Sequence, residues 1–174
     1  MLTSSMSFRR SGAALLLGAI VLGGLAARSV QAQAPPDLSG TWMLDETRSD
    51  PGALAQAGRG GRGGAPAGQL VVKQSATEIS VQRGNQSFTY NVDGSEMPGP
   101  PGGETKSKMN WEGDKLIVTW KREFFAGAER GYQTSTGRDV YTLSGTTLTV
   151  ERTVTNARGS GGTQTVKSVY NKAP

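Results

Sequence analysis

Few residues of this sequence could do chemistry, because its 174 residues include no histidine and no cysteine. Nucleophilic sites that pair serine or cysteine with histidine are therefore impossible. Cysteine or histidine zinc sites, iron–sulfur clusters and histidine-ligated haem are excluded for the same reason. The absence of cysteine also excludes disulfides. Carboxylates, arginines, tyrosines and tryptophans are the side chains that remain for a functional site.

Carboxylate pairs are the remaining candidates for acid–base catalysis. Asp45 with Asp50, or Glu123 with Asp139, could in principle act as general acid and general base. Both pairs are expected on surface strands and loops, where nothing indicates a cleft. Asp45, Glu46 and Asp50 could also form part of a calcium site, but their spacing matches no calcium-binding loop. We therefore expect neither an enzyme nor a bound metal or other cofactor.

Arg122 and Arg152 are predicted to lie on the apolar faces of two strands. Every second residue of a strand points to the same face. The residues that share a face with one of these arginines are mostly apolar: Leu116, Val118, Trp120 and Phe124 with Arg122, and Leu148, Val150 and Val154 with Arg152. An unpaired charge inside a barrel is costly, so each arginine needs a carboxylate partner, a water-filled cavity or a ligand.

Several interpretations of the two arginines remain open. They could bind the carboxylate or phosphate head of an amphipathic ligand, since the guanidinium group suits such anions. Alternatively, a β-bulge could shift the register, the arginines could lie at the open end of a barrel, or they could stack on a tryptophan. Tyr90, Trp120 and Tyr170 are the other candidate ligand contacts. Further predicted interior residues are Leu70, Val72, Ile79, Val81, Phe88, Met109 and Trp111.

Short alternating runs separated by turn residues follow Ala34, which is typical of antiparallel β structure. The best helix candidate, Ala53–Ala57, is stopped by Gly58 after about one turn. The predicted strands are Gly40–Asp45, Gln69–Gln74, Glu78–Arg83, Gln86–Val92, Thr105–Trp111, Lys115–Phe125, Gly137–Leu143, Thr147–Thr155 and Thr163–Asn171. Tight turns join most of them, so we expect an all-β, up-and-down meander of about 8–10 strands closing into a barrel.

Residues 1–32 are predicted to be a signal peptide. Arg9 and Arg10 precede an apolar run, Ala13–Ala27, which is shorter than the roughly 20 residues of a membrane-spanning helix. Val30-Gln31-Ala32 provides small residues for cleavage. The alternative is an amphipathic anchor left in place, and the paired arginines leave both the general and the twin-arginine export routes open. We expect residues 33–174 to form one exported bacterial domain, periplasmic or secreted, without a transmembrane segment.

The positive charge of the chain is concentrated in the predicted signal peptide. The whole chain has a formal charge of +5, but removing Arg9, Arg10 and Arg28 leaves 16 basic residues against 14 acidic ones. This near balance gives no basis for a nucleic-acid partner. Two low-complexity stretches, the Gly/Arg-rich residues 57–68 and the Pro/Gly-rich residues 94–104, are predicted to be surface loops.

The two ends of the predicted domain resemble those of the calycin superfamily, which includes lipocalins and fatty-acid-binding proteins. Residues 37–44 are similar to its G-x-W-x-L opening, and residues 166–172 to an R-x-Y-x-K ending in which Ser168 replaces the arginine. The chain more closely resembles small secreted bacterial lipocalin-like proteins without an established activity. Their S-G-T-W-x-L-D and G-G-E-x-x-S-K…W-x-G-D-K-L stretches are matched at 39–45 and 102–116.

The resemblance covers residues 37–172 and implies a lipocalin-like barrel in which Gly40 and Trp42 have structural roles. It is compatible with two functions. The first is a carrier that binds a small apolar or amphipathic ligand inside the barrel. The second is a barrel filled by side chains that acts through its surface as a protein-interaction or envelope-associated module. In the second case the contact elements would be the loops at 51–68 and 94–104. We expect a monomer.

Overall fold

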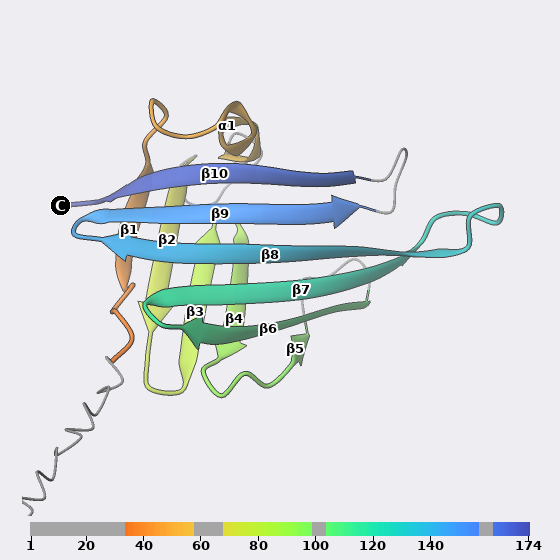
Figure 1. Ribbon diagram of the computed structural model, residues 1–174, viewed down its shortest axis with the longest axis horizontal. Coiled ribbons are helices and arrows are strands. Elements are labelled where there is room, and N and C mark those ends of the chain that lie inside the picture. The colour runs from red at the N-terminus through yellow and green to blue at the C-terminus, as the bar shows by residue number, and fades with distance from the viewer. Residues whose placement is uncertain (1–33, 58–67, 99–103, 157–161) are drawn as a thin grey trace, which may run out of the picture. The chain divides into compact units, whose positions relative to one another are not determined.

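The computed structural model describes residues 34–57, 68–98, 104–156 and 162–174. The predicted signal peptide and residues 58–67 of the Gly/Arg-rich loop lie outside the described residues. Ten strands and one short helix, α1 (Pro51–Ala57), make up the described structure (Figure 1). The strands are β1 (Gly40–Leu44), β2 (Gln69–Gln74), β3 (Glu78–Arg83), β4 (Gln86–Asn91), β5 (Met97–Pro98), β6 (Glu104–Glu112), β7 (Lys115–Phe125), β8 (Tyr132–Ser144), β9 (Thr147–Asn156) and β10 (Gly162–Lys172).

All ten strands belong to one antiparallel sheet with the order β4-β3-β2-β1-β10-β9-β8-β7-β6-β5. Sequence neighbours pair as hairpins except at β4–β5, and the first strand pairs with the last, with Trp42 opposite Lys172. This pairing nearly closes the sheet into a barrel and leaves β4 and β5 as its two ends. At that seam the Asn91 side-chain amide donates hydrogen bonds to Ser95 Oγ (2.8 Å) and Met97 Sδ (3.1 Å). The predicted all-β meander is confirmed.

Three elements differ from the sequence-based expectation. Residues 51–57 form helix α1, and the Pro/Gly-rich stretch contains the short strand β5. Strand β8 begins at Tyr132, five residues before the predicted start at Gly137. The prediction missed this part because Gln133–Thr136 show no alternation of apolar and polar residues. Residues 51–57 are therefore not a loop available for partner contacts, as the surface-module hypothesis required.

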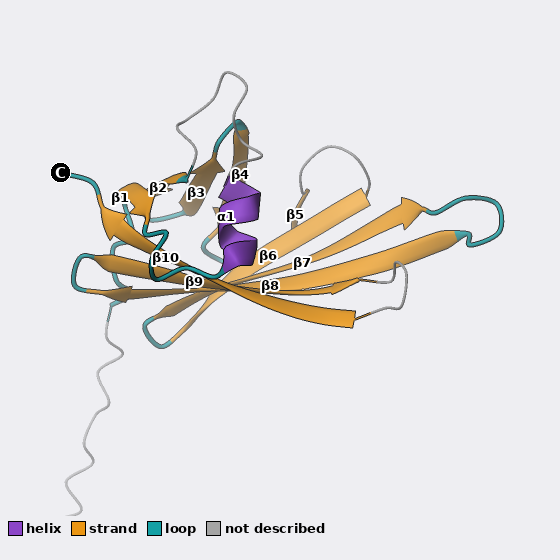
Figure 2. Cartoon of the chain, turned by 90° about the horizontal axis from the view of Figure 1, so that it is seen from above, coloured by secondary structure: helices purple, strands orange, loops and turns teal. Residues whose placement is uncertain are grey.

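Helix α1 and the segment before it cover the free edge of β10. Asp45 N donates to Val169 O (2.7 Å), and Asp50 N donates to Lys167 O (2.9 Å). In return, Lys167 N donates to the Asp50 carboxylate (2.7 Å). Figure 2 shows α1 lying between the β1–β4 side of the barrel and the β6–β10 side. The edge backbone groups of Lys167 and Val169, which β1 does not reach, are thus satisfied locally.

The core lies inside the barrel and contains most of the predicted interior residues. Leu70, Val72, Ile79, Val81 and Met109 are buried, and Phe88 and Trp111 pack against the core as partly buried residues. Trp42 is fully buried, and its indole N–H donates to Leu38 O (3.0 Å). Gly40 has a positive φ of 144°, and a Cβ there would come within 3.0 Å of the Lys172 side chain, so this position requires glycine.

Within the described part of the chain, no helix combines the length and the apolar character that crossing a bilayer requires.

Candidate ligand-binding site

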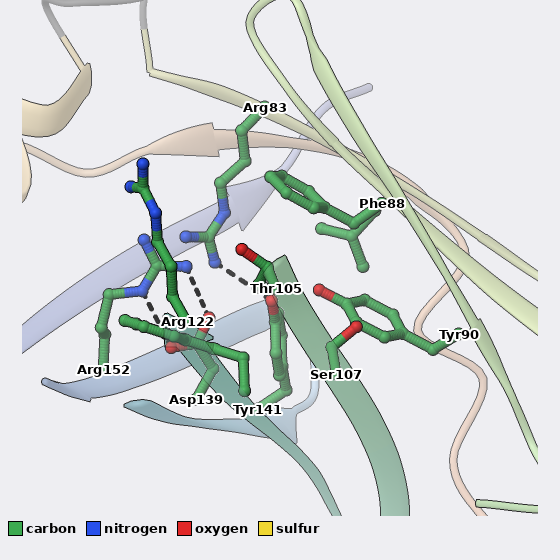
Figure 3. Close-up of a pocket in the computed structure, with 11 residues that line it drawn as sticks. Arg83, Phe88, Tyr90, Thr105, Ser107, Arg122, Asp139, Tyr141 and Arg152 are labelled. Carbon is green, nitrogen blue, oxygen red and sulfur yellow. Dashed lines mark hydrogen bonds and ion pairs between the residues drawn. The ribbon is translucent and has the colours of Figure 1, made fainter. Parts of the chain in front are cut away.

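The barrel contains a partly open cavity of about 190 Å³. Six strands contribute its lining, and most of them contribute two residues separated by one position. The lining residues are Val81 and Arg83 (β3), Phe88 and Tyr90 (β4), Thr105 and Ser107 (β6), Trp120 and Arg122 (β7), Asp139 and Tyr141 (β8), and Arg152 (β9) (Figure 3). This spacing follows from the alternation of side chains along a strand, which turns every second residue inward.

Arg152 lies opposite Asp139 in the β8–β9 ladder and forms a paired, doubly hydrogen-bonded contact with it. Arg152 Nε donates to Asp139 Oδ1 (2.8 Å), and Arg152 Nη2 donates to Oδ2 (2.5 Å). The side chains are 30% and 3% exposed, respectively. Burial disfavours the charged guanidinium, but the hydrogen bonds and attraction of Asp139 outweigh it and raise the pKa of Arg152. A carboxylate partner was one of the predicted ways to accommodate this arginine.

The expected position of Asp139 on a surface strand is wrong. Asp139 is buried, with 2% of the residue exposed, and it lines the cavity. Asp139 and Tyr141 are two positions apart on β8 and therefore share its inner face. The pair Glu123/Asp139 is not brought together either. In the β7–β8 ladder, Glu123 lies opposite Thr134, whereas Asp139 lies opposite Val118. Asp139 therefore has a role in holding Arg152 rather than in a carboxylate pair.

Arg83 is a third arginine of the cavity, and it was not among the predicted ligand contacts. Its Nη2 donates to the Tyr141 hydroxyl (3.1 Å), and its guanidinium lies 5.9 Å from the centre of the Tyr141 ring. The Nε of Arg83 is buried and has no hydrogen-bond acceptor among the described residues. A signal for Arg83 was present, because it follows Ile79 and Val81 at the same period of two.

Arg122 lies at the rim of the cavity and is exposed to solvent. Its guanidinium is 5.9 Å from the centre of the Phe124 ring, two residues further along β7. Trp120, two residues earlier, lines the cavity and lies opposite Gly137 of β8. A Cβ at Gly137 would overlap the Trp120 indole, so glycine lets this ring lie against the neighbouring strand.

The two cavity tyrosines are neutral hydrogen-bonding groups. Burial raises the pKa of both Tyr90 and Tyr141 above the usual tyrosine range, so both keep their hydroxyl protons at neutral pH. Tyr170, the fifth predicted ligand contact, is buried in the hydrophobic core and does not belong to the cavity lining. The structure thus brings Arg122, Arg152, Tyr90 and Trp120 together around one space, and places Tyr170 elsewhere.

The cavity is positively charged and partly aromatic. Three arginines face it against one aspartate, and Figure 3 shows their guanidinium groups gathered on one side, with Phe88 and Tyr90 on the other. Such a lining suits a small molecule that has an anionic group at one end and an apolar body at the other. It does not suit a metal ion, because Asp139 is engaged by Arg152 and the described residues contain no cluster of three acidic ligands.

No protein-family model, curated protein or solved structure gives a significant match to this chain. The fold itself, an antiparallel and nearly closed barrel, is compatible with the calycin-like architecture that the resemblance implied.

Proposed function

We propose that this protein is an exported binding protein for a small amphipathic anion that it holds inside the barrel. The observation that carries the proposal is the cavity of about 190 Å³ in which three arginines face aromatic side chains. Signal-peptide features at the N-terminus support export, and the barrel fold is compatible with ligand binding. A barrel completely filled by side chains would lack this space, so the cavity favours the carrier hypothesis over the surface-module hypothesis.

The volume limits the ligand to a small molecule. An engineered apolar cavity of roughly 150 Å³ binds benzene, whereas pockets for drug-sized ligands begin at about 300 Å³. A cavity of about 190 Å³ therefore accepts one aromatic ring or a short chain with its polar head. A long-chain fatty acid would not be enclosed, which is consistent with Ser168 in place of the arginine of the R-x-Y-x-K ending.

The charges assign different tasks to the arginines. Arg152 forms an ion pair with Asp139, so it lines the cavity without being the main contact of the anion. Arg83 carries a buried Nε without an acceptor among the described residues, and Arg122 lies at the rim. We assign the anionic head of the ligand to these two guanidinium groups, which suit a carboxylate or a phosphate monoester.

Binding can be tested with small aromatic ligands that carry either an anionic or a neutral polar group. We expect benzoate and phenyl phosphate to bind the purified protein, and benzyl alcohol, the neutral analogue, to bind far more weakly. Calorimetry gives the affinity, and the part of the tryptophan emission that is lost in a Trp120→Phe variant reports occupancy of the cavity. Arg83→Gln and Arg122→Gln should each weaken binding roughly tenfold to a hundredfold, since each removes a charge-assisted hydrogen bond.

Arg138→Gln is the matched control, because Arg138 lies on β8, is exposed, and pairs with Glu112 outside the cavity. It should leave binding unchanged. Equal affinity for benzoate and benzyl alcohol, or equal affinity in the Arg83, Arg122 and Arg138 variants, would contradict the proposal. Failure of every ligand to bind, together with native mass spectrometry showing no bound metabolite after gentle extraction from the producing cells, would also contradict it.

A further inference from the structure

The β7–β8 hairpin extends past both of its neighbouring strands. Strand β7 pairs with β6 only as far as Glu123, and β8 pairs with β9 only from Thr136 onward. Phe124 and Phe125, paired with Gln133 and Tyr132, therefore form a two-stranded ribbon, which projects away from the other strands (Figures 1 and 2). The sequence predicted β7 as far as Phe125 but did not predict the part of β8 that pairs with its end. The ligand-binding function proposed above does not use this ribbon.

The tip of the ribbon carries an exposed aromatic pair. Phe125 is 60% exposed and Tyr132 is 80% exposed, and these are two of the three exposed large hydrophobic residues in the described chain. They lie opposite each other in the ladder, and their ring centres are 5.5 Å apart in an edge-on arrangement. Exposing two adjacent rings is costly in water, which indicates a surface that covers them.

The turn that joins these two residues is tight and stands clear of the rest of the chain. Ala126 N donates to Gly131 O (2.8 Å), and Gly131 N donates to Gly127 O (2.8 Å). Both glycines have positive φ angles, and an added Cβ would meet nothing within 4 Å at either position. The aromatic pair therefore lies at the narrow tip of the β7–β8 hairpin.

The narrow shape of the hairpin tip favours a membrane surface over a protein as its partner. A stable protein interface buries about 800 Å² on each partner, and the end of a two-stranded ribbon does not offer such an area. The interface of a lipid bilayer needs no complementary pocket, and aromatic rings with a polar edge settle at the level of its headgroups. Between Lys121 and Tyr132 the ribbon carries three basic and two acidic residues, so its net charge favours an anionic lipid surface.

We propose that the β7–β8 tip docks this protein on the surface of an anionic phospholipid membrane, with Phe125 and Tyr132 entering the headgroup region. The docking does not depend on the cavity having a ligand. It does have a consequence for the cavity, because Arg122 at the rim precedes Phe125 by three residues, a distance of about 10 Å along a strand. A docked tip would therefore hold the cavity rim close to the membrane surface.

Vesicle flotation tests the docking directly. The purified protein should float with vesicles of phosphatidylethanolamine and phosphatidylglycerol, and less with vesicles of phosphatidylcholine alone. The double variant Phe125→Ser/Tyr132→Ser should lose roughly tenfold or more in partitioning, because it removes the apolar groups that enter the interface. Met43→Ser is the matched control, since Met43 is the third exposed large hydrophobic residue and lies on β1. It should float like the parent.

A second variant reports the position of the tip itself. In Phe125→Trp, the additional tryptophan emission should shift to shorter wavelength on adding the anionic vesicles, and lipids brominated on their acyl chains should quench it. The proposal is overturned if the parent binds neither kind of vesicle. It is also overturned if the double variant, shown to be folded by its circular dichroism spectrum, floats as well as the parent. A concentration-dependent dimer that the double variant abolishes would also overturn it, because the tip would then be a self-association surface. Benzoate binding by the same double variant should be unchanged, which separates this test from that of the cavity.

Discussion

The contact between Arg152 and Asp139 shows how one residue pair makes a charged cavity possible. Of the two side chains, Asp139 in particular could not be buried alone, because burying an unpaired charge costs several kcal/mol. Their exposures are unequal, however, since Asp139 is 3% exposed and Arg152 is 30% exposed. The consequence of removing one partner should therefore depend on which charge is left behind.

We expect Arg152→Met to lower the free energy of unfolding by about 3 kcal/mol, because it leaves the Asp139 carboxylate buried without its partner. Asp139→Asn should cost less, about 1 kcal/mol, because the guanidinium left behind reaches solvent and keeps a neutral acceptor. Urea unfolding of the two variants measures the difference. Arg138→Met, which breaks an exposed pair with Glu112, is the control and should change stability by less than about 1 kcal/mol. Equal losses in the two cavity variants would contradict this asymmetry.

At the scale of elements, the Asp45 carboxylate is one of the groups that hold the segment between β1 and α1 in place. Asp45 accepts hydrogen bonds from the hydroxyl of Thr47 (2.6 Å), from Arg48 Nε (2.7 Å) and from Asn171 Nδ2 (3.1 Å). The Thr47 hydrogen bond, followed by that of Arg48, lowers the pKa of Asp45 well below its usual range. Since this segment covers the edge of β10, the carboxylate ties the start of the barrel to its last strand.

The lowered pKa of Asp45 makes its contribution to stability dependent on pH. Ionised Asp45 stabilises the folded chain fully above the ordinary carboxyl pKa of about 4, and the contribution is lost as the pH falls below that value toward the folded-state pKa. We therefore expect Asp45→Asn to lower the Tm at pH 7, and the difference from the parent to shrink progressively between about pH 5 and pH 2. Thermal unfolding monitored by circular dichroism across this range measures both curves.

Asp114→Asn, in the exposed turn between β6 and β7, is the matched control for Asp45. Its Tm curve should run parallel to that of the parent. A constant difference between Asp45→Asn and the parent at all pH values would show that hydrogen bonding by the side chain, and not its ionisation, supports the segment.

At the scale of the whole described domain, the barrel is closed at one pairing and open at another. Strands β1 and β10 pair directly, whereas β4 and β5 are the two ends of the sheet order. The long ladders β7–β8, β8–β9 and β9–β10 form the other side of the barrel. Local opening should therefore start at the β4–β5 seam, where the fewest backbone hydrogen bonds must break.

Hydrogen exchange can locate this opening. We expect the amides of β4 and β5 to exchange with opening free energies below the global free energy of unfolding, and the central amides of β8 and β9 to exchange only on global unfolding. Hydrogen exchange measured by nuclear magnetic resonance at several low denaturant concentrations distinguishes the two classes of amides. The opening free energy depends steeply on denaturant for global unfolding and weakly for local opening. Uniform protection across all strands would contradict the expectation that opening starts at the β4–β5 seam. Benzoate should raise the protection of the Tyr90 amide if the ligand bridges β4 to β9.

Much of the fold could be predicted from local patterns in the sequence. Alternation placed eight of the nine predicted strands close to their observed bounds and turned Tyr90, Trp120, Arg122 and Arg152 inward, because side chains alternate between the two faces of a strand. The beginning of β8 was missed, because Gln133–Thr136 are polar and are held only by their ladder with β7. Ala53–Ala57 was the best helix candidate in the sequence, and helix α1 extends it back to Pro51, next to Asp50, which is hydrogen-bonded to β10.

The remaining features of the site required the tertiary structure. That Asp139 faces Arg152, and that Arg83 reaches Tyr141, depends on the registers of ladders between strands that are distant in the sequence. Whether space remains inside the barrel depends on the summed volume of side chains from six strands. The sequence by itself determined the strands, their inward faces and the absence of histidine and cysteine chemistry, because these are local or compositional properties. Only closure of the sheet decided which charges meet and that a cavity lies between them, because both follow from which strands pair and in which register.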